Sequence, residues 1–179
     1  MISPVCVRGF SFLASGRWRI DTGYRGYRSS RINFRRNVFL PGWSLIQRGA
    51  FKIDKSANDS RLVTYHDPCN VARAAGYFEP PRNIIKATCN RFVEMHPDTV
   101  REKTYCCGAG AGLLADEIME LRMAGGKPRA EACRATGANY LATICAICKA
   151  NLPEVMKHHK VPATVGGVHD LLGNALVFK

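Results

Sequence analysis

The chain has 179 residues, 46% of them hydrophobic, which is enough for one domain with an apolar core plus a tail. It has no run of 18 apolar residues, so the sequence predicts no membrane-spanning helix. The formal net charge is +12, but residues 1–60 contribute +8 and residues 61–179 only +4. Because the basic residues lie mostly outside the segment with most of the cysteines, the charge does not indicate a nucleic-acid partner.

Residues 1–42 differ from the rest of the chain. Residues 1–40 hold eight arginines, no lysine and a single acid, Asp21, without a sustained helical or strand period. Three interpretations remain open: a poorly ordered basic arm, an organelle transit peptide, or an artefact of a truncated or frame-shifted gene. None of them makes this segment catalytic, so the functional domain is predicted to span residues 43–179.

Beyond Trp43, predicted strands and helices alternate. A first helix is expected to end at Gly49, and a polar loop covers residues 55–60. The predicted strands are 62–65, 103–105, 140–144 and 161–165, and the predicted helices are 81–95, 113–123, 127–136, 146–159 and 169–177. Gly125-Gly126 is expected to separate two helices, and Pro153 to interrupt another. Residues 113–123 have the pattern of an amphipathic core helix. The alternation predicts an α/β fold of βα units with a mainly parallel sheet.

The cysteine pattern is the main functional signal. The eight cysteines are Cys6, Cys69, Cys89, Cys106, Cys107, Cys133, Cys145 and Cys148. Adjacent cysteines and a C-x-x-C motif, without a clear signal peptide, favour a thiolate metal site in a reducing compartment over disulfides. Cys89 and Cys133 fall inside predicted helices and are expected to be core residues. Cys6 is assigned no role.

The other five cysteines form three groups, at Cys69, at Cys106–Cys107 and at Cys145–Cys148. Intervals of 36 and 37 residues separate the groups, and each group follows a predicted strand. The sequence therefore predicts that all five thiols meet at the carboxyl edge of the sheet, where ligands bind and helix N-termini stabilise thiolates.

Five sulfurs exceed the four ligands of a tetrahedral zinc ion, which favours an iron–sulfur cluster. A structural zinc site remains the alternative, formed by Cys69, Cys145, Cys148 and one of the two adjacent cysteines. The Gly-rich segment after Cys107 lacks the spacing of a dinucleotide fingerprint. Gly108 and Gly110 are instead expected to let the backbone approach a cluster and direct N–H groups at its sulfides.

Three motifs give the sequence a specific resemblance. They are His66-Asp67-Pro68-Cys69, Cys106-Cys107-Gly108-Ala109-Gly110 and Cys145-Ala146-Ile147-Cys148. They resemble the cysteine-rich "CCG" domain that occurs in the B and D subunits of heterodisulfide reductases and in lactate- and glycolate-oxidising iron–sulfur subunits. Around residues 65–73 the chain is most similar to the catalytic iron–sulfur subunit of the membrane complex associated with dissimilatory sulfite reductase.

The resemblance implies a 4Fe–4S cluster, of the non-cubane type in heterodisulfide reductases, bound through Cys69, Cys106, Cys107, Cys145 and Cys148. It implies sulfur metabolism, in which a disulfide or trisulfide is reduced or formed. The implied partners are a small sulfur-carrier protein or a heterodisulfide, together with ferredoxin-like and membrane subunits. The implied location is the cytoplasm, peripheral to the inner membrane. Longer relatives carry ferredoxin-like cysteine runs upstream that are not found in this sequence, so electron delivery to the site is expected either to be missing or to come from another chain.

Two residues of the first motif are candidates for catalysis. His66 could donate a proton to a leaving thiolate, and Asp67 could orient it. The alternative is that both residues cap the turn and bond to the backbone. Two other functions also remain open. One is an electron-transfer subunit of a lactate or glycolate oxidase, and the other is a structural zinc module. Whether the chain is an enzyme outside a complex is left open.

Overall fold

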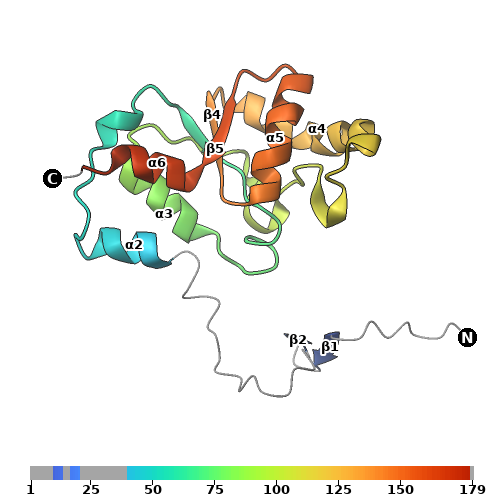
Figure 1. Ribbon diagram of the computed structural model, residues 1–179, viewed down its shortest axis with the longest axis horizontal. Coiled ribbons are helices and arrows are strands. Elements are labelled where there is room, and N and C mark those ends of the chain that lie inside the picture. Colours follow the sequence, from blue (N-terminus) through green and yellow to red (C-terminus); the bar gives the residue numbers. More distant parts are fainter. Residues whose placement is uncertain (1–9, 14–16, 21–39, 178–179) are drawn as a thin grey trace, which may run out of the picture. The chain divides into compact units, whose positions relative to one another are not determined.

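The computed structural model describes residues 10–13, 17–20 and 40–177 (Figure 1). The chain divides into two units, residues 1–34 and 35–179. In the first unit, β1 (Phe10–Leu13) and β2 (Arg17–Ile20) pair antiparallel, with Phe10 opposite Ile20. The sequence shows no sustained strand period at these two segments, and the interpretation of residues 1–42 as a poorly ordered arm stays a prediction. The remainder of residues 1–39, including Cys6, lies outside the described residues.

The second unit is built on a three-stranded parallel sheet. Its strands are β3 (Val63–Tyr65), β4 (Tyr140–Thr143) and β5 (Thr164–Gly167), in the order β3-β4-β5. This confirms the α/β fold. The strand predicted at 103–105 does not form, since Arg101–Lys103 is a 3₁₀ turn and Thr104-Tyr105 is irregular. The last strand begins three residues later than predicted.

Helices cover both faces of this sheet (Figure 1). Helices α3 (Glu79–Thr88) and α6 (Val168–Ala175) lie on one face, and α4 (Met119–Ala135) and α5 (Ala146–His158) on the other. Side chains of β4 alternate between the two faces. Tyr140 and Ala142 pack in the apolar core beneath α3 and α6, and Leu141 packs in the core beneath α4 and α5. With both faces covered, β3 and β4 are buried at every position. In the described parts of the chain, no helix is long and apolar enough to cross a bilayer.

The ends of the first two helices follow local rules. Helix α2 (Leu40–Gln47) ends before Gly49 as predicted; Gly49 has φ +66°, and the Ala50 N–H donates to Leu45 O at 2.9 Å. Helix α3 ends at Thr88, seven residues earlier than expected, because the following segment pairs with β3. There the N–H of Val63 donates to Arg91 O, and the N–H of Val93 donates to Val63 O. Cys89 caps α3 and is buried, as predicted.

Helix α4 runs unbroken through Gly125-Gly126, so the predicted break is wrong. At Gly126 other parts of the chain lie too close for a side chain. A Cβ on Gly126 would lie 2.6 Å from a methyl group of Val155 and 3.0 Å from Cys107 O. A Cβ on Gly125 would lie 3.4 Å from the Cα of Gly108, which is ordinary van der Waals contact. The glycine pair therefore allows α5 and the segment after Cys106 to pack directly on α4.

Two further helix predictions fail. Residues 113–118 form no α-helix: two 3₁₀ turns, Gly110–Gly112 and Asp116–Ile118, precede α4. Leu113, Leu114 and Leu121 are exposed, so the interpretation as a core helix is wrong. Helix α5 continues through Pro153, because one missing N–H is outweighed by the burial of Leu152 and Val155.

The close contact at Gly126 gives a stability prediction. Gly126→Ala should lower the free energy of unfolding by about 1–3 kcal/mol, because Val155 and the Cys107 carbonyl must move. Gly173→Ala in α6 is the matched control, since no atom lies within 4 Å of the position that a methyl group would take there. That variant should be stabilised by about 0.5–1 kcal/mol. Urea denaturation of both variants makes the comparison, and equal stability of the two would contradict the close packing at Gly126.

Candidate functional site

The cysteine groups gather around the carboxyl edge of the sheet, but only two of them follow strands. Cys69 lies in the turn after β3, and Cys145 is the N-cap of α5 after β4. The N–H of His66 donates to Ala142 O at 2.9 Å, which extends the β3–β4 pairing toward Cys69. Cys106 and Cys107 follow irregular chain instead, so the prediction of a strand before each group is wrong for this pair.

Three of the five thiols form a row of contacts. The side chain of Cys106 interacts with that of Cys107, and the side chain of Cys107 with that of Cys148. The row ends at His66, whose Nε2 lies 3.3 Å from Cys148 Sγ. Cys107 and Cys148 are buried, Cys145 is half-buried, and Cys69 and Cys106 are exposed. Among the described residues, no three Cys, His, Asp or Glu side chains converge as a ligand shell for one metal ion.

The thiols of Cys106 and Cys107 have raised pKa values. The hydrogen bond with Cys107 and burial raise the pKa of Cys106, while the N–H groups of Gly108 and Gly110 oppose that rise. A hydrogen bond with Cys106 lowers the pKa of Cys107, but the bond with Cys148 and burial outweigh it and raise that pKa to about 11. The thiols of Cys106 and Cys107 are thus protonated at neutral pH, and a bound metal would displace their protons.

The two predicted glycines lie against this row. The N–H of Gly108 points at Cys106 Sγ, 3.3 Å away. Gly108 has φ +96°, and a Cβ there would lie 2.8 Å from the backbone nitrogen of Gly126. A Cβ on Gly110 would stand 3.4 Å from Cys106 Sγ. The backbone therefore passes close to a cysteine sulfur at both positions, and a side chain at Gly108 is excluded.

His66 and Asp67 are both fully buried, and they face different partners. Burial, with the nearby charge of Arg129, lowers the pKa of His66 well below its ordinary value. Its Nδ1 has no hydrogen-bond partner among the described residues. The Asp67 carboxylate accepts from Arg82 at 2.8 and 2.7 Å and from the N–H of Arg101 at 2.8 Å. The carboxylate thus bonds to Arg82 and Arg101, and not to the imidazole that it was expected to orient.

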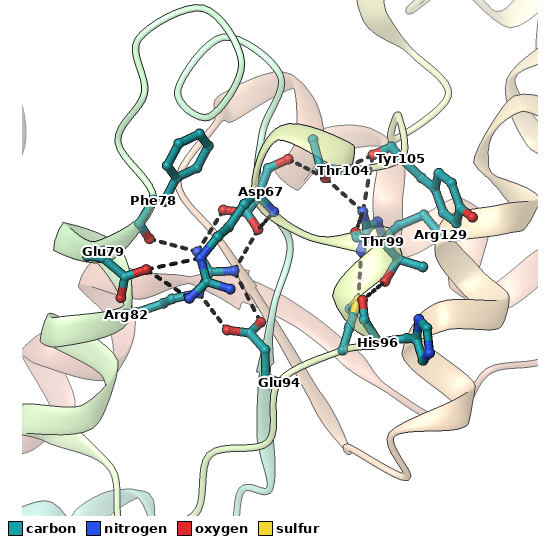
Figure 2. A network of polar contacts seen from close by, with 12 residues as sticks. Asp67, Phe78, Glu79, Arg82, Glu94, His96, Thr99, Thr104, Tyr105 and Arg129 are labelled. Atoms are coloured by element: carbon teal, nitrogen blue, oxygen red, sulfur yellow. Dashed lines mark hydrogen bonds and ion pairs between the residues drawn. The ribbon is translucent and has the colours of Figure 1, made fainter.

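Arg82 is the centre of a buried polar network (Figure 2). Besides Asp67, its guanidinium contacts Glu94 at 2.5 Å and the carbonyl of Phe78 at 2.7 Å. Burial alone would lower the pKa of Arg82, but the hydrogen bonds and charges of Asp67 and Glu94 outweigh it and raise that pKa. The network joins α3 to the loop that carries His66 and Cys69.

Three other arginines hold the segment of the adjacent cysteines. Arg73 donates to the carbonyls of Glu102 and Thr104. Arg122 donates to Asn151, which in turn donates to Cys107 O at 2.6 Å. Arg129 donates to Thr104 Oγ1 at 2.7 Å (Figure 2). Side-chain hydrogen bonds thus hold Cys106 and Cys107 in position, whereas a preceding strand positions each of the other cysteine groups.

The roles of Arg122 and Arg129 were not predicted from the sequence, although the spacing of residues along this helix could have indicated them. Positions 122, 126, 129 and 133 repeat at intervals of four, three and four residues, so they share one face of a continuous helix. That face is buried in α4 and includes Arg122 and Arg129. The predicted break at Gly125-Gly126 concealed the repeat. Cys133, on the same face, is fully buried as predicted.

The Asp67–Arg82 pair gives a second stability prediction. Arg82→Met should lower the free energy of unfolding by about 3–5 kcal/mol, because it leaves a buried carboxylate without its partner. Lys103→Ala removes a cation from an exposed pair with Asp98 and should leave the free energy of unfolding almost unchanged. Chemical denaturation of both variants measures the difference. A small loss in Arg82→Met would show that the network is not a main support of the fold.

Comparisons with known proteins identify the family of the chain. The family model described as "Cysteine-rich domain" (CCG) matches residues 63–153. The chain is 49% identical over 138 residues to the Hdr-like menaquinol oxidoreductase iron-sulfur subunit 2 of Archaeoglobus fulgidus, covering 75% of this chain and 25% of that protein. It is 38% identical over 133 residues to the D subunit of the dihydromethanophenazine:CoB–CoM heterodisulfide reductase of Methanosarcina mazei, covering 74% and 31%.

The matched region includes all five cysteines of the site and both glycines. The chain spans only about a quarter to a third of the length of these relatives. The match nevertheless covers half of the chain, and the identity to the relatives extends over three quarters of it. The chain therefore belongs to the CCG cysteine-rich domain family, whose relatives include Hdr-like iron–sulfur subunits and the D subunit of heterodisulfide reductase.

Proposed function

We propose that this chain is an iron–sulfur redox module of the heterodisulfide reductase type. The observation that carries the proposal is the row of contacts from Cys106 through Cys107 to Cys148 at the carboxyl edge of the sheet. Thiolates are the ligands that iron–sulfur clusters take, and several irons can each use a different sulfur. Relatives named as iron-sulfur subunits support the same assignment.

The proposed ligands are Cys69, Cys106, Cys107, Cys145 and Cys148. Cys107 and Cys148 would hold the buried side, and the other three, which are more exposed, the outer side. The N–H groups of Gly108 and Gly110 already point at a cysteine sulfur, and such donors stabilise anionic sulfur. We propose a 4Fe–4S cluster, of the non-cubane form that heterodisulfide reductases carry. When bound, it would supply one-electron transfer and an iron that can hold a substrate sulfur.

The proposed reaction is the reduction or formation of a disulfide or trisulfide in sulfur metabolism, on a small sulfur-carrier protein or a heterodisulfide. Cleavage of one disulfide consumes two electrons and two protons and releases two thiols. A ferredoxin-like subunit would supply the electrons, in a complex that is cytoplasmic and peripheral to the inner membrane. The relatives named as a heterodisulfide reductase subunit and as a menaquinol oxidoreductase subunit support this choice.

His66 is the proposed proton donor to the departing thiolate, although its lowered pKa keeps the imidazole neutral in the chain itself, so a charged donor would form only beside anionic sulfur. The support is geometric: its Nε2 contacts Cys148 Sγ at 3.3 Å, inside the row of thiols. Asp67 is proposed to have a positioning role only, because its carboxylate holds the loop that carries His66 in place through Arg82.

The first experiment tests the cluster. Anaerobic reconstitution of the full chain with iron and sulfide should give an absorption band near about 400 nm and bound iron and acid-labile sulfide. Cys107→Ser and Cys148→Ser should lose most of both, whereas the matched core variant Cys133→Ala should retain them. A colourless protein that binds about one zinc ion per chain and no iron would replace this proposal with the structural zinc site.

The second experiment tests His66. With a reduced viologen dye as electron donor and a small disulfide as substrate, His66→Ala should keep its iron and lose about 10²-fold or more in turnover. His169→Ala, an exposed histidine at the start of α6, should behave like the unmodified chain. Full turnover in an iron-loaded His66→Ala protein would remove the proton-donor role.

A further inference from the structure

Arg129 on α4 is fully buried, and its hydrogen-bond partners are all neutral. Its guanidinium contacts Met95 Sδ at 2.6 Å. It also donates to Thr99 O at 2.7 Å and to Thr104 Oγ1 at 2.7 Å (Figure 2). The ring of Tyr105 lies 5.7 Å away. Its Nε has no partner among the described residues. Burying a cation without an ion pair is costly in free energy, so a nearby negative charge would stabilise the guanidinium of Arg129.

The carboxylates in the same network do not bond to Arg129. Asp67 is occupied by Arg82 and the N–H of Arg101, and Glu94 is bonded to Arg82. Arg82 therefore has two acidic partners, whereas Arg129 has none in direct contact among the described residues. Burial accordingly lowers the pKa of Arg129 to about 10, although the group remains charged at neutral pH.

The unpaired cation lies beside the thiol row. Its Nη2 is 3.4 Å from the carbonyl of Tyr105, the residue directly before Cys106. Among the charges that act on Arg129, that of Asp67 is the largest and that of Cys148 is smaller, and the charge of Arg129 in turn acts on the imidazole of His66, which contacts Cys148. Arg129 therefore lacks a directly bonded negative partner, and deprotonated cysteines and sulfides would bring further negative charge to this edge.

We propose that Arg129 is an electrostatic positioning residue, a buried counter-charge for the anionic iron–sulfur site that favours both retention of the cluster and its reduced state. The inference rests on the proposed function. Each added electron makes the site more negative, and a fixed cation in a region of low dielectric constant stabilises that form. A hydrogen-bonding role alone would not depend on the charge.

The test compares three variants of the full chain. Arg129→Gln keeps hydrogen-bond donors but removes the charge, Arg129→Lys keeps the charge, and Arg134→Gln removes an exposed charge from the same helix. After reconstitution, Arg129→Gln should have a more negative midpoint potential and should release iron to a chelator about tenfold faster. Arg129→Lys and Arg134→Gln should stay close to the unmodified chain.

The cluster-free protein provides a readout that is independent of the loaded site. In urea, cluster-free Arg129→Gln should lose less stability than Arg82→Gln, because only the latter strands a buried carboxylate. The inference is overturned if Arg129→Gln loses as much stability as Arg82→Gln while its potential and iron release match those of the unmodified chain. It is also overturned if Arg129→Lys, which keeps the charge, shifts the potential as far as Arg129→Gln.

Two results distinguish a failure of the counter-charge role of Arg129 from a failure of the proposed iron–sulfur function. If the unmodified chain binds iron and sulfide but the potential is insensitive to Arg129, only the counter-charge fails. If the unmodified chain takes up zinc and neither iron nor sulfide, the proposed function itself fails, and the counter-charge with it.

Discussion

The structure around the site depends on the buried ion pair between Asp67 and Arg82. Asp67 lies two residues after β3, beside His66 and close to Cys69, and both of its carboxylate oxygens are bonded. A buried pair is tolerated only when its polar atoms are satisfied, so its partners must stay in place. The Asp67 carbonyl also accepts from Thr104 Oγ1 at 2.9 Å. The turn after β3, helix α3 and the segment before Cys106 are therefore held as one unit.

This unit explains how Cys106 and Cys107 reach the site without a strand. From the Thr104 hydroxyl, the polar contacts continue to Arg129 on α4, while Asn151 on α5 holds the carbonyl of Cys107. Glycines at 108, 125 and 126 then let the backbone lie directly on α4. Sheet pairing thus supports Cys69 and the Cys145–Cys148 group. Side-chain contacts and close packing of glycines support Cys106 and Cys107.

The two fully buried arginines of the network have different surroundings, and that difference bears on function. Arg82 meets two carboxylates, and its role in stability follows from the folded chain alone. Arg129 meets only neutral groups beside a row of thiols that are protonated when no metal is bound. Conversion of those thiols to thiolates would reverse the electrostatic situation of Arg129 from unfavourable to favourable. The folded domain is in this respect preorganised for an anionic occupant.

The sequence by itself determined the α/β class, the strands before Cys69 and Cys145, the core positions of Cys89 and Cys133, and the family. Those features depend on local hydrophobic patterns and on short motifs with fixed spacing. Only the tertiary structure decided that α4 crosses Gly125-Gly126, that residues 113–118 form no α-helix, and that Asp67 bonds to Arg82 instead of His66. The first and last of these depend on contacts between segments apart in the chain: the carbonyl of Cys107 and Val155 at Gly126, and Arg82 at Asp67. Local propensity contains no information about such partners, because the identity of a residue does not reveal which distant group it will meet.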